Sequence, residues 1–415
     1  MTLTQGQHEA MAMVKRLMAR EGHAVAVMAG YAGTGKTFLL KAIAETFGVP
    51  VVIAPTGKAA ARVKEMAGLA AMTIHRWLYE AVTDKDTGTC TFDRKAPDQI
   101  PVGSIGLLVV EESSMVSREL WNDIVDTAQM LRLKVLLIGD PFQLSPVERD
   151  EKWRSFSVLD PSAGFAGEYT LLTEIQRQAL DSPIIRVSMA IRAGDVSAVM
   201  TELSLVPALD FMTAGAGVQR NSGVILCYKN STRHWINEGV RTQLGFTEDI
   251  QDGEPVVVLK NNYGLGVNNG ETYRFRRWEE LTHSRHTVVD KRAEARETTR
   301  FGIAVLEDVE VGTCFRAVVA QEELFGRMKS GTHAIGKAME ISFRGLPQVH
   351  ANLGYGLTCH KAQGSEWNEV LIAWEPSLRF WGQFRDDALR WAYTAITRAK
   401  TRCYISLGAT APNTL

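Results

Sequence analysis

The segment GYAGTGKT, Gly30 to Thr37, matches the spacing G-x-x-x-x-G-K-[ST] and follows an apolar run typical of a buried strand. Glycines at these positions let backbone N–H groups turn inward around phosphate oxygens, and the helix that starts near Lys36 adds its positive end. Lys36 would reach the β- and γ-phosphates of a nucleotide, and the Thr37 hydroxyl would bind Mg²⁺. A chance glycine turn is the alternative, but the order of strand, loop and helix favours a nucleotide site.

Two acids, Glu111 and Glu112, end the apolar run in LLVVEESS, where P-loop enzymes carry a second motif. The first acid of such a pair normally holds Mg²⁺, often through water, and the second polarises the attacking water. The first is usually Asp, and Glu has the same charge with a longer reach. We therefore expect a working site with modest changes in metal geometry. The alternative of two solvated surface acids is disfavoured by the apolar run.

Three further segments contain polar residues suited to phosphate chemistry. In LLIGDPFQLSPV, Asp140 would support the metal shell, and the amide of Gln143 would hydrogen-bond a γ-phosphate or its attacking water. Arg177 in LTEIQRQ and Arg398 in YTAITRAK have the charge that stabilises a transferring phosphoryl group. Neither arginine would be convincing on its own sequence context.

The elements that must position these residues follow from short apolar runs separated by helical patterns. AVAVMAG, VPVVIAP, IGLLVVEE and KVLLIGD each predict a strand buried on both faces, and GVILCYKN, EVLIAWE and TRCYISL form a second such set. Strands of this kind favour a parallel α/β sheet, in which ligands bind at the carboxyl ends. Residues 79–102 interrupt the first set and are either a protruding hairpin or a disordered surface loop. Residues 248–349 contain short β-type segments and predict a β-rich insertion.

Composition excludes several classes of protein. The chain has 415 residues, too many for one ordinary core. Its 46 basic against 47 acidic residues argue against a surface covered in positive charge and leave a local basic cleft open. The five cysteines form no CxxC pair, so neither a zinc site nor a disulfide framework is predicted, and a reducing compartment is expected. No apolar run reaches membrane-spanning length, and the N-terminal segment has the pattern of a helix of the fold rather than of a signal peptide.

The order of motifs resembles that of a known family. GYAGTGKT, APTGKAAARV, TIHRWL, VVEESS, GDPFQLSPV, LTEIQRQ, LTCHKAQGSEW and YTAITRAK follow one another along the chain. This sequence resembles the superfamily 1 helicases of the branch that contains RecD and the phage Dda helicase, and most closely Dda. The resemblance covers nearly the whole chain and weakens at residues 79–102 and in the β-rich segment.

The resemblance implies an α/β fold with two RecA-like P-loop lobes. The first would span residues 1–175 with a hairpin at 79–102, the second 176–247 and 350–415, and an SH3-like accessory insertion 248–349. It also implies a motor that uses ATP and Mg²⁺ to move 5′ to 3′ along single-stranded DNA and to open duplex at junctions. A monomer in the cytoplasm of a bacterium or of a phage-infected host is expected, with a single-stranded-DNA-binding protein as a partner.

The resemblance also implies a functional role for individual residues of these motifs. Tyr393 would support the arginine motif that follows it. Residues implied around the nucleotide and its metal are Gln7 at the adenine, Gly30, Gly33, Thr34, Gly35, Lys36, Thr37, Glu111, Glu112, Gln143, Arg177, Glu366 and Arg398. Residues implied to face DNA are Thr56, Lys58, Thr73, His75, Thr358, His360, Lys361 and Gln363, with Phe92 at the apolar tip of the strand-separating hairpin. Lysines, hydroxyls and amides suit phosphate contacts, and imidazole rings can stack on bases, although a lone His is more often a packing or capping residue.

Three other functions are alternatives to the helicase. A nucleic-acid-stimulated ATPase could remodel protein–DNA or RNA complexes without efficient strand separation. A P-loop module in which the Glu pair no longer catalyses is disfavoured because Lys36, Gln143 and both arginines are kept. A nuclease is disfavoured because no clustered carboxylate motif is left outside the ATPase set.

Overall fold

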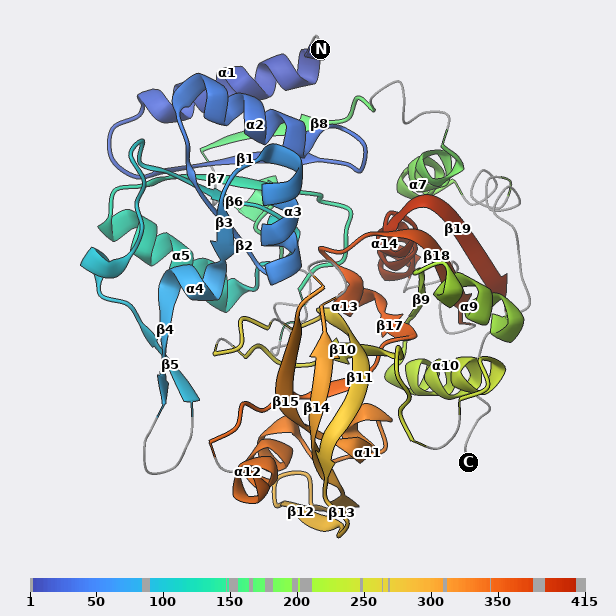
Figure 1. Ribbon diagram of the computed structural model, residues 1–415. Coiled ribbons are helices and arrows are strands. Elements are labelled where there is room, and N and C mark those ends of the chain that lie inside the picture. Colours follow the sequence, from blue (N-terminus) through green and yellow to red (C-terminus); the bar gives the residue numbers. More distant parts are fainter. Residues whose placement is uncertain are drawn as a thin grey trace. The chain divides into compact units, whose positions relative to one another are not determined.

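The computed structural model divides the chain into two compact units, which Figure 1 colours along the sequence. It describes residues 3–83, 90–146, 148, 156–163, 167–175, 182–195, 201, 211–246, 249–262, 264–267, 269–308, 312–343, 345–375 and 385–407. The first unit comprises Met1–Leu205 and Phe380–Thr397, and the second comprises Val206–Arg379 and Arg398–Leu415. The predicted bounds differ from those of these units, since the first unit also contains the helices at Pro183–Ala193 and Arg385–Ile396, and the two lobes with the predicted bounds stay a prediction.

The first unit is built on a six-stranded parallel sheet in the order β3-β2-β6-β7-β1-β8. Its strands are β1 (Ala24–Gly30), β2 (Val51–Ala54), β3 (Ala71–Thr73), β6 (Leu107–Val110), β7 (Lys134–Gly139) and β8 (Glu168–Leu172). All four residues of β6 and the last five of β7 are buried. The apolar runs in the sequence therefore correctly predicted central strands covered on both faces.

Alternate residues of these strands point into two separate cores. On one face, Ala26 and Met28 pack with α1 (Gln5–Ala19), α2 (Lys36–Phe47) and α3 (Gly57–Ala67). On the other, Val27 and Ala29 pack with α4 (Ile74–Leu78) and α5 (Arg118–Met130). Figure 1 shows α1 and α2 on the side of the sheet away from α5. The helices α7 (Pro183–Ala193) and α14 (Arg385–Ile396) complete this unit and contact each other.

The segment 79–102 contains a β-hairpin. Strand β4 (Tyr79–Thr83) pairs in antiparallel register with β5 (Cys90–Arg94), with Thr83 opposite Cys90. The guanidinium of Arg94 forms an ion pair with Asp123 of α5, which ties the base of the hairpin to the first unit. Of the two alternatives, hairpin and disordered loop, the structure supports the hairpin.

The second unit contains a four-stranded parallel sheet in the order β17-β9-β18-β19. Its strands are β9 (Val224–Cys227), β17 (Gly356–Thr358), β18 (Trp367–Trp374) and β19 (Ala399–Leu407). The helices α9 (Phe211–Arg220) and α10 (Asn230–Gln243) pack against it, and the short helix α13 (Cys359–Ala362) follows β17. The second set of apolar runs in the sequence predicted β9, β18 and β19.

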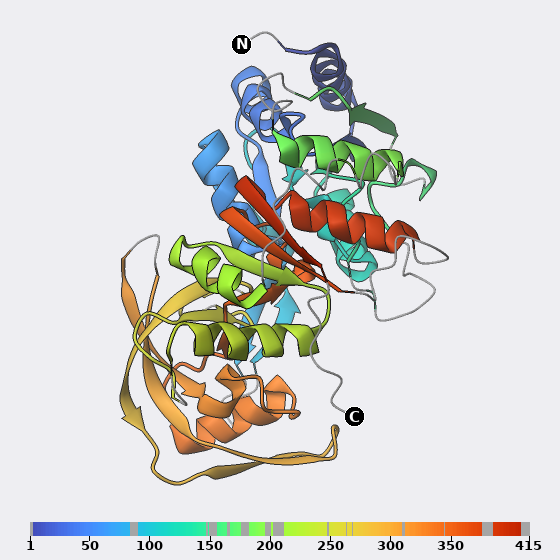
Figure 2. The ribbon, with the colours of Figure 1, turned by 90° about the vertical axis from the view of Figure 1, so that its right-hand side faces the viewer.

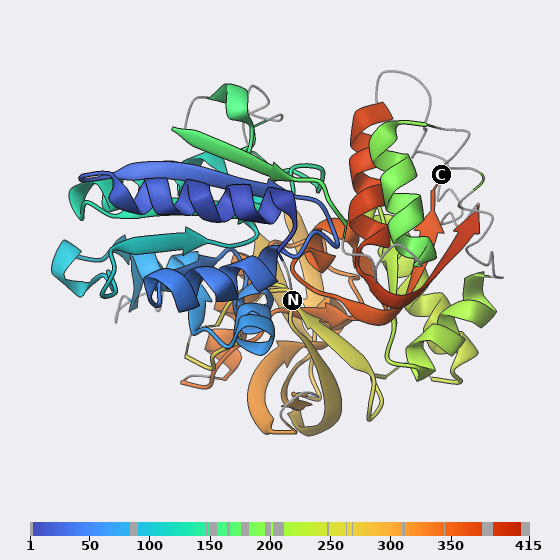
Figure 3. The same cartoon turned by 90° about the horizontal axis from the view of Figure 1, so that it is seen from above.

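The β-rich segment forms an antiparallel sheet in the order β15-β14-β11-β10-β16. Its strands are β10 (Pro255–Val258), β11 (Thr272–Leu281), β14 (Phe301–Glu307), β15 (Cys314–Ala320) and β16 (Ala351–Leu353), with a separate hairpin of β12 (His286–Asp290) and β13 (Ala295–Thr299). Figures 2 and 3 show how strongly the long strands curve. The helices α11 (Gln321–Leu324) and α12 (Thr332–Ser342) lie against this sheet. The prediction of a β-rich segment is correct, but its sheet extends past residue 349 to include β16.

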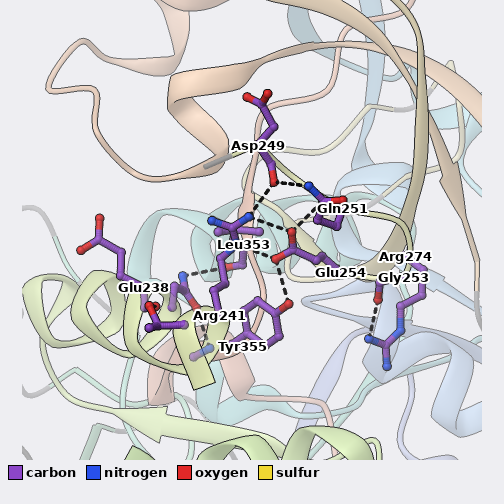
Figure 4. A network of polar contacts seen from close by, with 12 residues as sticks. Glu238, Arg241, Asp249, Gln251, Gly253, Glu254, Arg274, Leu353 and Tyr355 are labelled. Carbon is purple, nitrogen blue, oxygen red and sulfur yellow. Dashed lines mark hydrogen bonds and ion pairs between the residues drawn. The ribbon is translucent and has the colours of Figure 1, made fainter. Parts of the chain in front are cut away.

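The antiparallel sheet shares a hydrophobic core with β9 and α10. Ile225 of β9 and Ile236 of α10 belong to the same buried cluster as Val256 and Phe275 of the antiparallel sheet. A polar network at the same junction is drawn in Figure 4, where the wholly buried Glu254 accepts from Arg241 of α10, with Nε to Oε2 at 2.6 Å. The Tyr355 hydroxyl donates to the same oxygen at 2.8 Å. A buried charge so fully paired fixes the geometry with which the β-rich segment leaves α10.

No helix within the described ranges has the length and apolar character needed to span a membrane.

Candidate nucleotide and nucleic-acid sites

The phosphate-binding loop lies between β1, which ends at Gly30, and α2, which begins at Lys36. Gly33 and Gly35 have φ angles of 78° and 81°, the left-handed region that favours glycine. At Gly30 the constraint is space, because an added Cβ would lie 2.8 Å from Oγ1 of Thr34. The loop thus has the shape in which successive amides and a helix N-terminus receive an anion.

The Lys36 ammonium is folded back onto this loop. Its Nζ donates to the carbonyl oxygens of Gly30 and Tyr31, at 2.8 and 3.1 Å. These are neutral acceptors, and a phosphate oxygen makes a stronger, charge-assisted bond with an ammonium group. A bound polyphosphate would therefore draw the Lys36 ammonium away from these carbonyl oxygens.

Gln7 joins the start of the chain to the same loop. Its Nε2 donates to the Thr34 carbonyl at 3.1 Å, and its Oε1 accepts from the Thr4 amide at 3.0 Å as half of a capping box on α1. Gln7 is 2% exposed. Its side chain thus supports the loop, and the recognition of adenine by Gln7 stays a prediction.

Glu111 and Glu112 follow β6 directly, at the carboxyl edge of the sheet. Burial, then the neighbouring charge of Glu112, raises the pKa of Glu111 to about 7, although its Oε2 accepts from the Glu112 amide at 2.7 Å. Glu112 has a φ of 49°, uncommon for a residue with a side chain. Such strain is found where surrounding structure enforces it, often at functional sites. These acids are not solvated surface residues, so that alternative is wrong.

The turn after β7 presents two more predicted residues. Asp140 is fully buried, and its Oδ1 accepts from the Phe142 amide at 3.0 Å. Burial raises the pKa of Asp140, opposed by the charge of Lys36 and by hydrogen bonds. Gln143 is 5% exposed, and its Oε1 has no hydrogen-bond partner in the part of the chain that is described. An unpaired buried acceptor at the edge of this sheet is suited to a water molecule or a protonated ligand group.

These groups fit a nucleotide with its metal. The loop offers amides and Lys36 to phosphates, while Thr37 in the first turn of α2 and the buried Glu111 offer oxygen atoms of the kind that Mg²⁺ prefers. No cluster of three or more His, Cys, Asp or Glu residues that could hold a metal occurs among the described residues.

Helix α14 forms hydrogen bonds with both the turn that contains Asp140 and the phosphate-binding loop. The Tyr393 hydroxyl donates to Oδ2 of Asp140 at 2.6 Å and accepts from the Ala32 amide at 2.8 Å. The sequence predicted Tyr393 only as a support for the arginine motif, and no spacing pattern could have revealed these two partners.

Four candidate DNA-facing residues belong to the first unit. Thr56 and Thr73 cap α3 and α4, each hydroxyl accepting a helix amide at 3.2 Å, which leaves each hydroxyl its proton to donate. His75 lies on α4 beside the ring of Tyr79, with ring centroids 5.6 Å apart, and burial lowers the His75 pKa. Lys58 lies in the first turn of α3. All four therefore follow the carboxyl ends of β2 or β3.

Four candidates belong to the second unit. Thr358 ends β17, and His360 and Lys361 lie on α13 with Gln363 directly after it. Burial, and after it the charge of Arg233, lowers the pKa of Lys361 to about 8. Arg233 of α10 is 5% exposed, and its Nε and Nη1 have no hydrogen-bond partner among the described residues. Two neighbouring cations, of which Arg233 has unused donors among the described residues, suit an anion such as a backbone phosphate. No sequence motif marks Arg233.

The remaining predicted residues are Arg398, Glu366, Arg177 and Phe92. Arg398 and Glu366 both belong to the second unit, where Nη1 of Arg398 donates to the Ser365 carbonyl at 3.2 Å. Arg177 lies outside the described residues. Phe92 lies within β5 opposite Ala81, and its role at the apolar tip of the strand separator stays a prediction.

Comparison with protein families gives two matches. Residues 2–210 match a family model described as an AAA domain. Residues 353–406 match one described as a UvrD-like helicase C-terminal domain.

Two curated relatives align along most of this chain. The ATP-dependent RecD2 DNA helicase of Deinococcus radiodurans is 27% identical over 94% of this chain and 48% of its own length. The RecBCD enzyme subunit RecD of Mycolicibacterium smegmatis is 26% identical over 91% of this chain and 67% of its own length. This chain thus spans only about half of the RecD2 protein. Conjugal transfer proteins TraA also match, over 59% of this chain.

Solved structures support the fold. Bacteroides Pif1 bound to single-stranded DNA matches with a TM-score of 0.56 and 18% identity, covering 100% of this chain and 95% of that one. Bacteroides Pif1 with ADP-AlF3 and single-stranded DNA matches with a TM-score of 0.54 and 19% identity, covering 98% and 92%. At this identity the likeness concerns the fold, and it confirms the predicted α/β architecture with RecA-like lobes. A particular closeness to the phage Dda helicase stays a prediction.

Proposed function

We propose that this chain is an ATP-dependent DNA helicase. It belongs to the AAA domain family, and it is a superfamily 1 helicase of the RecD/Pif1 type. In this proposal it moves 5′ to 3′ along single-stranded DNA and separates duplex at junctions. The observation that carries the proposal is the edge of the six-stranded sheet. A complete phosphate-binding loop, an acid pair whose first member Glu111 is buried, and the Gln143 amide oxygen, which has no hydrogen-bond partner among the described residues, all lie at the carboxyl ends of its strands.

The chemical roles follow from the groups at this edge. Lys36 leaves its carbonyl partners to bind the terminal phosphates, and Thr37 and Glu111 would hold Mg²⁺. A bound Mg²⁺ neutralises charge on the phosphate oxygens. Glu112 accepts a proton from the attacking water, and the Gln143 amide orients that water. Arg177 and Arg398 are proposed to stabilise negative charge on the phosphoryl group during transfer.

The DNA roles rest on the side chains that follow the strands. Hydroxyls at helix N-termini and the lysines Lys58 and Lys361 would contact backbone phosphates, which explains binding without reading of sequence. The hairpin of β4 and β5 is the proposed strand separator, and the antiparallel sheet an SH3-like accessory element that steadies DNA. A monomer with a single-stranded-DNA-binding protein as partner is proposed with this function.

The test measures ATP hydrolysis with Mg²⁺, with and without single-stranded DNA, for the parent, Lys36→Ala and Glu111→Asp. We expect strong stimulation by DNA in the parent, loss of at least about 10²-fold in Lys36→Ala, and retained activity in Glu111→Asp. An inactive parent restored by Glu111→Asp would instead indicate a nucleotide-binding module whose site no longer catalyses.

Direction and strand separation need a second experiment. Duplexes with a single-stranded 5′ tail should be unwound, and those with only a 3′ tail should not. A variant in which residues 80–93 are replaced by a short glycine-serine link should keep DNA-stimulated hydrolysis and lose unwinding. If it unwinds as well as the parent, the protein is better described as a translocase that remodels complexes.

A further inference from the structure

We propose that Tyr393 is a positioning residue of the nucleotide site, whose hydroxyl joins the phosphate-binding loop to the turn that carries Asp140 and Gln143. The inference rests on the proposed ATPase function for its kinetic consequence. Its structural consequence, a change in the loop itself, can be measured without catalysis.

The hydroxyl of Tyr393 has two partners from two different elements. It accepts from the Ala32 amide at 2.8 Å and donates to Oδ2 of Asp140 at 2.6 Å. Tyr393 is 0% exposed, so no water can readily replace it. A single buried hydroxyl therefore sets the spacing between the third residue of the phosphate-binding loop and the carboxylate at the end of β7.

Two further residues of α14, one helical turn apart, form hydrogen bonds with the same turn. Nη1 of Arg390 donates to the Pro141 carbonyl at 2.6 Å, and Oγ1 of Thr394 accepts from the Leu144 amide at 2.9 Å. The turn between Asp140 and Leu144 is thus held by three successive contacts from one face of α14. Gln143 lies inside this turn, so α14 determines where its amide points.

The phosphate-binding loop also contacts helix α7. The guanidinium of Arg192 on α7 lies over the ring of Tyr31, 3.7 Å from the ring centroid, and α7 packs against α14. Tyr31 and Ala32 are adjacent, and the Tyr31 carbonyl is one of the acceptors of Lys36. The two helices together fix the part of the loop that flanks the lysine.

Loss of the Tyr393 hydroxyl would leave two groups without this partner, the N–H of the half-buried Ala32 and one oxygen of the buried Asp140. The loop and the turn could then relax independently, and a displacement of about 1 Å between reacting groups costs about 10²-fold in rate. Phosphate binding depends on many amides at once and would suffer less. A positioning role therefore predicts a loss in kcat larger than any rise in KM for ATP.

The experiment compares Tyr393→Phe with Tyr355→Phe. Tyr355 is a matched control because it is 2% exposed and donates to a buried carboxylate, Glu254, in the second unit. For Tyr393→Phe we expect kcat to fall about 10- to 100-fold while KM for ATP changes less than about threefold. Tyr355→Phe should lower thermal stability and leave kcat within about twofold of the parent.

Hydrogen exchange of the full chain gives the readout that does not require catalysis. The Ala32 amide should exchange about fivefold faster or more in Tyr393→Phe and unchanged in Tyr355→Phe. Unchanged exchange at Ala32, or a kcat within twofold of an active parent, overturns the inference. An inactive parent overturns the proposed function instead, and the exchange result still decides the role of Tyr393.

Discussion

Replacing Glu111 by Gln is expected to stabilise the protein at pH 8 and to do so much less at pH 5. Burial raises the pKa of this carboxyl from 4.5 to about 7 in the folded state. A carboxyl that takes up protons more readily when folded loses stability as the pH rises from its unfolded to its folded pKa. The difference of about 2.5 pKa units, at 1.36 kcal/mol each, corresponds to about 3 kcal/mol at pH 8 and about 1 kcal/mol at pH 5.

The amide of Gln keeps the local hydrogen bond, because its Oε1 can still accept from the Glu112 amide. The measurement is thermal unfolding of parent and variant at both pH values. At about 2–4 °C per kcal/mol, we expect the variant to gain about 6–12 °C at pH 8 and about 2–4 °C at pH 5. Glu65→Gln, at an exposed position of α3, is the control and should change little at either pH.

A gain of equal size at both pH values would refute the reasoning, because it would arise from packing and not from ionisation. No gain at pH 8 would show that the charge of Glu111 is already compensated in the folded protein. The expected result would mean that the ionised Glu111 lowers the free energy of unfolding. A residue that destabilises the protein in this way is kept for its part in catalysis.

Three further results are expected. Glu254→Ala should destabilise the second unit by about 3–5 kcal/mol in urea unfolding, because it leaves Arg241 buried without its counter-charge. Lys361→Met should weaken binding of a labelled oligothymidine at pH 7 and abolish the loss of affinity that the parent shows as the pH rises through about 8, measured by fluorescence anisotropy. Gly30→Ala should weaken binding of a fluorescent ATP analogue about tenfold or more, since the new Cβ would crowd Oγ1 of Thr34.

The sequence predicted the parallel sheets well because their strands are covered on both faces and read as unbroken apolar runs. β1, β6 and β7 all fall on such runs, and the phosphate-binding loop lies where a strand is followed by a glycine turn and a helix. The same periodicity could not show where the β-rich segment ends. Its last strand, β16, is only three residues long and pairs with β10 nearly a hundred residues earlier.

The contacts of α14 could not be predicted from local pattern. Its sequence belongs to a motif expected in the second lobe, but Tyr393, Arg390 and Thr394 bond to segments about 250 to 360 residues away. Arg233 was missed for a related reason. Its unused donors become visible only when α10 brings them beside Lys361.

The Glu in the first position of the acid pair has a structural explanation in its extra methylene. The longer side chain of Glu111 curls back so that Oε2 accepts from the next amide, that of Glu112, at 2.7 Å. The hydrogen bond offsets part of the cost of burying the charge, although burial still raises the pKa of Glu111. Glu111→Asp shortens the side chain and weakens this bond; because the bond favours the charged carboxylate, its loss should raise the pH at which activity appears. The choice of Glu therefore tunes the ionisation of the site and is consistent with a site in use.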